Sequence, residues 1–254
     1  MTAWISVCCG VAHPLSVDAT DGIVGILSLR SRQCSVVESC GSAAALREHA
    51  RKITVKVLTG GQWSSGILIR NHEQTYAVLT NEHVLRTGDS YQVQTVDGEV
   101  YAATASGGFA ENDLAVLRFR SDRRYEIATL GSSLSLPVGT PVFAAGFPVP
   151  GLANPGFTFT TGHISLVSPK VLEGGYQLGY TNLIEKGMSG GPVLNLRGDV
   201  IAINGTHQEP LWGDPYRFVD GTRPPLQMRP LLLRSSWAIP METFRRFADR
   251  LSLL

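Results

Sequence analysis

Length, composition and charge narrow the possible functions of this chain before any motif is considered. The 254 residues are 43% hydrophobic and 17% charged, a balance that excludes a disordered polymer. The formal net charge is +1, and basic residues are scattered among acidic ones, so we expect no nucleic-acid partner. No apolar run approaches the roughly 20 residues that cross a bilayer, and we expect no membrane span.

Residues 1–42 are expected to form a leader or a loosely ordered arm. They are rich in Ser and Gly, and they contain all four cysteines, Cys8, Cys9, Cys34 and Cys40. Disulfides can therefore form only within this segment, with a pairing that the sequence does not determine. The apolar run Ala3–Ala12 lacks the positive start of a secretory signal, which leaves the compartment open, periplasmic or secreted locations included. No second Cys or His pair has the spacing of zinc ligands, and we expect neither a metal nor another cofactor.

Residues 43–254 are predicted to form one folded domain that begins with a short helix. The segment Ala43–Arg51 consists mainly of strong helix formers. From residue 53 the pattern changes to short apolar or alternating runs, separated by turn residues such as Gly60-Gly61 and Asp97-Gly98. The first group of predicted strands comprises residues 53–57, 65–69, 76–80, 91–95 and 114–119.

A second group of predicted strands begins near Pro137. It comprises residues 141–145, 157–161, 164–167, 176–180, 192–196 and 200–204. Strands do not alternate with helices, which disfavours a parallel α/β sheet and favours a barrel or sandwich.

The C-terminal stretch is predicted to be an amphipathic helix over residues 240–254. Its large apolar residues fall on one helical face: Phe244, Phe247, Leu251 and Leu254. We interpret residues 212–216 and 236–240 as loops that pack against this helix.

Three segments contain the residue types of nucleophilic catalysis: Thr80-Asn81-Glu82-His83, Asn112-Asp113-Leu114 and Gly187-Met188-Ser189-Gly190-Gly191-Pro192. A serine hydroxyl is a weak nucleophile unless a base removes its proton, and histidine titrates near neutrality. A carboxylate is needed to hold the histidine tautomer. We therefore predict Ser189 as the nucleophile, His83 as the general base and Asp113 as the residue that orients His83.

The glycines around Ser189 permit a tight turn and a close approach of substrate to the main chain. The backbone N–H groups of Gly187 and Ser189 are the predicted donors to a developing oxyanion. Each such donor typically lowers the barrier by roughly 3–4 kcal/mol.

The order His, Asp, Ser and these three motifs resemble the chymotrypsin/trypsin-like peptidase family. The resemblance extends over residues 53–247 and is strongest to the bacterial branch, which includes DegP/HtrA-type and glutamyl endopeptidases. The segments Gly174–Gln177 and Glu185–Pro192 look like those of cyanobacterial trypsin-like peptidases. The resemblance implies an all-β fold of two six-stranded antiparallel barrels, over residues 53–125 and 137–235, with the triad between them.

The resemblance also implies a substrate pocket formed by Leu183, Ile184, Asn204, Gly205, Thr206 and His207. Leu183 stands where trypsin has aspartate, so cleavage after Arg or Lys is not expected. Asn204 stands where glutamyl enzymes have histidine, and the expected P1 residue is apolar or small. The edge formed by residues 205–207 is expected to pair with the substrate backbone.

One further departure concerns Met188, which occupies the place of an aspartate that pairs with the new N-terminus of trypsin-type zymogens. A methionine makes no ion pair, so we expect activity that does not depend on a freed N-terminus.

The predicted function is that of a serine endopeptidase acting on proteins or peptides; the sequence leaves the oligomeric state open. Two alternatives compete with it: a catalytically silent peptide-binding module on the same scaffold, and an α/β-hydrolase esterase. The esterase needs a strand–turn–helix around its serine, followed by the acid and the histidine. Pro192-Val193-Leu194 instead favours a strand after the serine. His163, at the start of a strand, is interpreted as structural.

Overall fold

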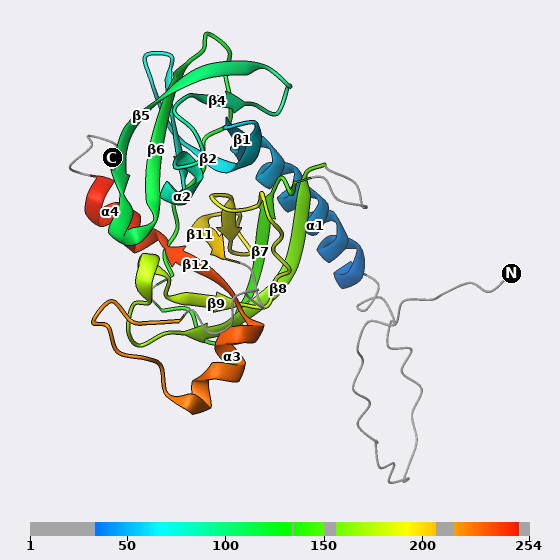
Figure 1. Ribbon diagram of the computed structural model, residues 1–254. Coiled ribbons are helices and arrows are strands. Elements are labelled where there is room, and N and C mark those ends of the chain that lie inside the picture. The colour runs from blue at the N-terminus through cyan, green and yellow to red at the C-terminus, as the bar shows by residue number, and fades with distance from the viewer. Residues whose placement is uncertain (1–33, 134, 150–155, 207–215, 249–254) are drawn as a thin grey trace, which may run out of the picture. The chain divides into compact units, whose positions relative to one another are not determined.

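Two closed barrels of six antiparallel strands each make up most of the fold (Figure 1). The computed structural model describes residues 34–133, 135–149, 156–206 and 216–248, and every structural statement here refers to these residues. Both barrels belong to one compact unit, Cys40–Leu254. The all-β double-barrel architecture expected from the sequence is thereby confirmed.

The first barrel has the strand order β1-β2-β3-β6-β5-β4, with β4 closing on β1. Its strands are β1 (Thr54–Thr59), β2 (Gln62–His72), β3 (Thr75–Thr80), β4 (Tyr91–Gln94), β5 (Val100–Phe109) and β6 (Leu114–Arg120). Alternating side chains such as Val55, Val57 and Val78 fill the interior. The short helix α2 (Glu82–Leu85) follows β3, and the 3-10 turn η1 (Ala110–Asn112) precedes β6.

Strand β5 is absent from the strands that the sequence predicted. Its residues are mostly Ala, Ser, Thr and Gly, and of these only Ala103 is buried. A strand with so few buried apolar side chains has no alternating pattern to detect. It forms because β4 and β6 pair with it on either side.

The second barrel has the strand order β10-β11-β12-β9-β8-β7, and β7 closes on β10. Its strands are β7 (Pro141–Gly146), β8 (Thr158–Val167), β9 (Leu178–Tyr180), β10 (Pro192–Leu194), β11 (Val200–Thr206) and β12 (Ser236–Pro240). The two strands predicted at residues 157–161 and 164–167 are one strand, β8. Gly162 and His163 continue its pairing with β7, and the register shifts beyond them, where β8 pairs with β9.

The interpretation of residues 236–240 as a loop was wrong, because they form β12, which pairs with both β11 and β9. The second barrel therefore extends beyond the predicted end at residue 235. Every residue of β12 is buried, and the indole Nε1 of Trp237 donates to the Leu232 carbonyl at 3.1 Å. Only three consecutive residues of β12 are apolar, and the segment ends at a proline, so it shows neither a long apolar run nor an alternating pattern. Of the other predicted loop, residues 212–215 lie outside the described residues, and Tyr216 packs against Trp237.

Five helical elements complete the described fold outside α2 and η1. Helix α1 (Cys34–Ile53) starts earlier than the predicted segment, and Leu46, Ala50 and Ile53 on it are buried. The second barrel carries η2 (Glu173–Gly175), η3 (Leu226–Met228) and α3 (Arg229–Arg234) between its strands. Helix α4 (Met241–Ala248) begins where the sequence predicted, and the end of the predicted helix, residues 249–254, lies outside the described residues.

Glu242 in the first turn of α4 is expected to stabilise the fold in a pH-dependent way. Burial raises the pKa of this carboxyl, but hydrogen bonds from Ser132 and Ser133 outweigh that effect and leave the pKa lowered. The Ser133 N–H and hydroxyl donate to it at 2.9 and 2.7 Å. A lowered folded-state pKa gives stability that is present above the unfolded pKa and is lost as pH falls through the folded pKa.

We expect Glu242→Gln to lower the free energy of unfolding by about 1 kcal/mol at pH 7, since solvent screening of this half-buried group limits the effect. The difference between the variant and the wild type should shrink as the pH falls from the ordinary glutamate pKa through the lowered folded-state pKa. Urea denaturation at pH 7 and at pH 3 measures both values, and an equal difference at the two pH values would contradict the assignment.

Candidate active site

His83 and Asp113, predicted to act together, lie in direct contact in the first barrel. His83 is on the four-residue helix α2, and Asp113 follows η1 in the left-handed region, with φ at 44°. The His83 Nδ1 lies 2.7 Å from Asp113 Oδ2, and the His83 backbone N–H donates to Oδ1 at 2.8 Å. The amide of Asn81 donates to the Asp113 carbonyl at 2.9 Å and holds the backbone of this residue.

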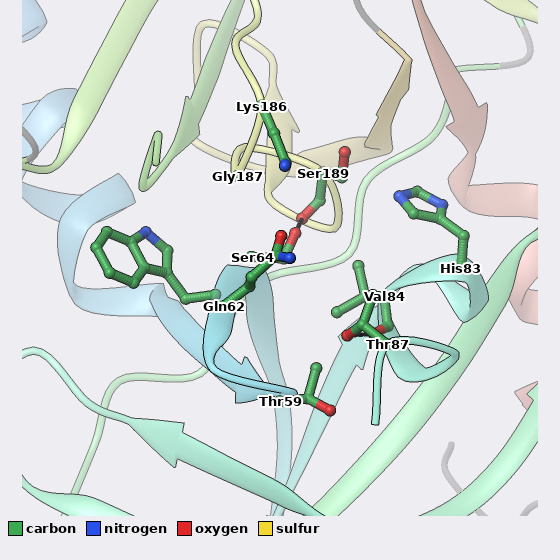
Figure 2. A pocket seen from close by; sticks show the side chains of 10 residues that line it. Thr59, Gln62, Ser64, His83, Val84, Thr87, Lys186, Gly187 and Ser189 are labelled. Carbon is green, nitrogen blue, oxygen red and sulfur yellow. Dashed lines mark hydrogen bonds between the residues drawn. The ribbon is translucent and has the colours of Figure 1, made fainter. Parts of the chain in front are cut away.

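The Asp113 side chain is more buried than the His83 side chain, as expected for an acid that orients a solvent-accessible base. The Asp113 side chain is 9% exposed and the His83 side chain 42%. The carboxylate is thus largely shielded from water, which strengthens its interaction with the ring. In Figure 2 the imidazole of His83 extends toward the side chain of Ser189.

Ser189 lies on the loop between β9 and β10 of the second barrel. Its hydroxyl donates to the Gly205 carbonyl at 2.9 Å, and no hydrogen bond joins it to His83 in the described part of the chain. Both side chains line the same cavity, of about 100 Å³ (Figure 2). Catalytic hydrogen bonds are often loose without substrate, and rotation about the Cα–Cβ bond of Ser189 redirects its hydroxyl.

The loop before Ser189 needs glycine. Gly187 has φ at 98°, and a Cβ on it would lie 2.6 Å from the Phe147 carbonyl oxygen. Within the described chain the N–H groups of Gly187 and Ser189 donate to no acceptor, whereas the neighbouring Met188 N–H donates to Glu185. Two free N–H groups on one tight loop are the arrangement that an oxyanion requires.

Two serines of the first barrel, which the sequence reasoning missed, hold this loop in place. Ser65 Oγ donates to the Gly187 carbonyl at 2.8 Å, and the Ser65 N–H donates to the Ser189 carbonyl at 3.0 Å. Ser64 Oγ donates to the same Ser189 carbonyl at 2.8 Å. The carbonyls are thereby turned toward β2. No sequence signal marks these serines, because their partners come from the other barrel.

Residues of both barrels line the cavity. The first barrel contributes Thr59, Gln62, Trp63, Ser64, His83, Val84 and Thr87, and the second contributes Lys186, Gly187 and Ser189. The indole Nε1 of Trp63 donates to the Phe147 carbonyl at 3.2 Å, a further bond across the two barrels. The candidate site therefore exists only where the barrels meet.

Comparison with known proteins identifies the family. A family model described as a trypsin-like peptidase domain matches residues 64–203, a segment that contains the three candidate residues. The chain belongs to the trypsin-like peptidase family.

Relatives of this peptidase domain include named proteases. A "Probable periplasmic serine endoprotease DegP-like" of Buchnera aphidicola is 34% identical over 55% of this chain and 29% of its own length. "Serine protease Do-like HtrA" of Bacillus subtilis is 28% identical over 74% of this chain and 40% of its length. "Serine protease HTRA4" of Mus musculus is 36% identical over 50% and 27%. The matched segment is thus less than half of each relative.

A solved structure supports the fold. The crystal structure of Deg5 superposes with a TM-score of 0.63 at 22% identity, over 83% of this chain and 95% of that chain. At this identity the likeness concerns the fold alone.

The residues expected to bind substrate in this peptidase domain differ in their surroundings. Leu183 is 54% exposed, whereas Ile184 is buried in the core of the second barrel, and neither lines the cavity of Figure 2. The Gly205 carbonyl accepts a hydrogen bond from the Ser189 hydroxyl. Thr206 is exposed at the end of β11, and His207 lies outside the described residues.

Asn204 departs from the expectation, because its side chain is fully buried and its polar atoms are already paired. Its Oδ1 accepts from the Tyr180 hydroxyl at 2.8 Å, and its Nδ2 donates to the carbonyls of Ala145 and Met188 at 3.0 and 3.4 Å. Asn204 therefore holds the loop that carries Ser189 through its hydrogen bond to the Met188 carbonyl.

Two further residues discussed in the sequence analysis are Met188 and His163. Met188 is fully buried in the core of the second barrel. His163 is exposed, and its backbone N–H donates to the Thr181 hydroxyl at 3.0 Å.

Among the described residues no three His, Cys, Asp or Glu side chains form a group suited to a metal ion. None of the described helices is long and apolar enough to cross a membrane.

Proposed function

We propose that this chain is a serine endopeptidase that hydrolyses peptide bonds through an acyl-enzyme at Ser189. The observation that carries the proposal is the hydrogen-bonded His83–Asp113 pair, which shares one cavity with Ser189 on a loop with two free N–H groups. Membership of the trypsin-like peptidase family supports it. So do the names of the relatives, which are serine proteases.

In the proposed reaction, Ser189 Oγ attacks the carbonyl carbon of the scissile bond while His83 Nε2 accepts the hydroxyl proton. The resulting oxyanion accepts hydrogen bonds from the N–H groups of Gly187 and Ser189. The C–N bond then breaks, and His83 gives the proton to the leaving amine. A water molecule, deprotonated by His83, then attacks the acyl carbon, the bond from that carbon to Ser189 Oγ breaks, and His83 returns the proton to Oγ. Asp113 stabilises the imidazolium in both halves of the reaction.

Labelling with a fluorophosphonate, which reacts covalently with activated serines, tests this function directly. We expect one label per chain, located at Ser189 by peptide mapping, together with cleavage of an unfolded protein substrate. A chain that binds peptides but is neither labelled nor able to cleave them would instead be a silent peptide-binding module. Labelling at another serine would also contradict the proposal.

For the P1 side chain we propose a preference for apolar or small residues. The exposed, apolar Leu183 side chain supports this. Digestion of a proteome-derived peptide library should give cleavage sites enriched in such residues at P1. A profile dominated by cleavage after Arg, Lys or Glu would overturn the preference.

A further inference from the structure

Tyr176 connects the second barrel to the candidate acid of the first barrel. It follows the turn η2, two residues before β9, and its hydroxyl donates a hydrogen bond to Asp113 Oδ2. The two residues are 63 positions apart in the chain. The same oxygen of Asp113 is the one that lies against His83 Nδ1.

The hydroxyl of Tyr176 completes the hydrogen bonding of the Asp113 carboxylate. Oδ1 accepts from the His83 backbone N–H at 2.8 Å, and Oδ2 accepts from both the His83 ring and Tyr176. Since a buried carboxylate without donors is costly, each of these bonds stabilises the ionised form. Burial raises the pKa of the Tyr176 hydroxyl well above its usual range, and the charge of Asp113 adds to the effect. Tyr176 therefore remains a neutral donor at any pH suited to an assay.

The ring of Tyr176 also packs on Gly205, the residue whose carbonyl accepts from Ser189. A Cβ on Gly205 would lie 2.0 Å from Cε1 of this ring, so the ring lies directly against the glycine backbone. The preceding Gly175 packs on Asn112, with Asn112 Cα 3.0 Å from a Cβ built on that glycine. One short segment thus contacts both the acid and the strand that holds the serine hydroxyl.

We propose that Tyr176 is a positioning residue that couples the two barrels: its hydroxyl orients the Asp113 carboxylate toward His83, and its ring holds Gly205 beside Ser189. The catalytic consequence of this role rests on the proposed peptidase function. The role itself concerns the state of His83 and is measurable without turnover.

Tyr176→Phe, which removes only the hydroxyl, is expected to lower kcat about tenfold with little change in KM, the loss of one hydrogen bond to a charged group. A carboxylate with one donor fewer attracts the imidazolium more strongly. The imidazole should then hold its proton to a higher pH, and the acid limb of the pH profile of kcat/KM should move upward. Tyr176→Ala, which also removes the ring from Gly205, should lose more activity than Tyr176→Phe.

Tyr76→Phe provides the matched control. Tyr76 is buried and Tyr176 partly buried; the Tyr76 hydroxyl donates to the Arg123 carbonyl at 2.8 Å and accepts from the Tyr125 N–H at 3.1 Å, in the first barrel and away from the site. This variant should lose comparable thermal stability and keep the wild-type pH profile. If Tyr176→Phe behaved in the same way, Tyr176 would contribute to stability alone.

A spectroscopic measurement separates failure of this inference from failure of the proposed function. The proton on His83 Nδ1 is observed by NMR in the Ser189→Ala background, with His83→Ala to assign the resonance. We expect Tyr176→Phe to shift this resonance and Tyr76→Phe to leave it in place. If the resonance shifts but the chain with Ser189 intact cleaves no peptide, the positioning role is upheld and the peptidase function is rejected. An unshifted resonance together with an unshifted pH profile would overturn the positioning role.

Discussion

Replacing Ser189 with alanine is expected to reduce kcat by a factor on the order of 10⁴ to 10⁶, with little change in KM. The physical reason is that alanine offers no oxygen to form the acyl-enzyme, whereas the oxyanion donors and the substrate contacts persist. His83→Ala should cost about as much, since the hydroxyl without a base is a weak nucleophile. The double variant should be hardly worse than either single one, because the residues act as a unit. Initial rates on a quenched fluorescent peptide measure all three.

Ser106→Ala is the matched control for this series. Ser106 lies on β5, and its hydroxyl makes only a long hydrogen bond, 3.4 Å, to the Val116 carbonyl. It should retain the activity of the wild type. Peptide cleavage by purified Ser189→Ala at more than a hundredth of the wild-type rate would reject Ser189 as the nucleophile.

The largest expected loss of stability comes from Trp237→Ala in β12. Trp237 is among the largest fully buried side chains, its ring packs on Tyr216 with centroids 5.9 Å apart, and its indole N–H is paired. Its removal leaves a cavity and deletes the indole hydrogen bond to the Leu232 carbonyl, and such changes typically cost about 3–5 kcal/mol. Urea denaturation followed by far-UV circular dichroism gives the free energy of unfolding.

Leu196→Ala serves as the comparison, since Leu196 is 67% exposed in the turn after β10. Its cost should be within about 0.5 kcal/mol of zero. A loss below about 1 kcal/mol for Trp237→Ala would mean that β12 does not close the second barrel as described.

The strands that the sequence predicted contain apolar runs or an alternating pattern, and the strands that it missed do not. Val and Leu alternate with polar residues in β1 and run almost continuously with Ala in β6, because their side chains fill a barrel interior. Strand β5 exposes most of its small side chains, and β12 contains only three consecutive apolar residues before a proline. Pairing with neighbouring strands determines these two, and pairing partners are far away in the sequence.

The residues of the candidate site also fall into those that the sequence predicted and those that only the structure revealed. His83, Asp113 and Ser189 could be proposed from the sequence because each stands in a short motif whose residue types suit one chemical role. The partners of that site carry no such motif. Ser65 reaches Gly187 from the other barrel, and Tyr176 reaches Asp113 in the same manner.

The sequence by itself thus determined the all-β class, the family and the three candidate residues. These depend on side-chain pattern and on chemistry encoded within a few consecutive positions. Only the tertiary structure decided that β5 and β12 are strands and that the side chain of Asn204 is hydrogen-bonded within the protein. It also decided that Tyr176 contacts both Asp113 and Gly205. The physical reason is that interstrand hydrogen bonds and contacts between the two barrels join residues whose proximity arises only when both barrels have closed and packed together.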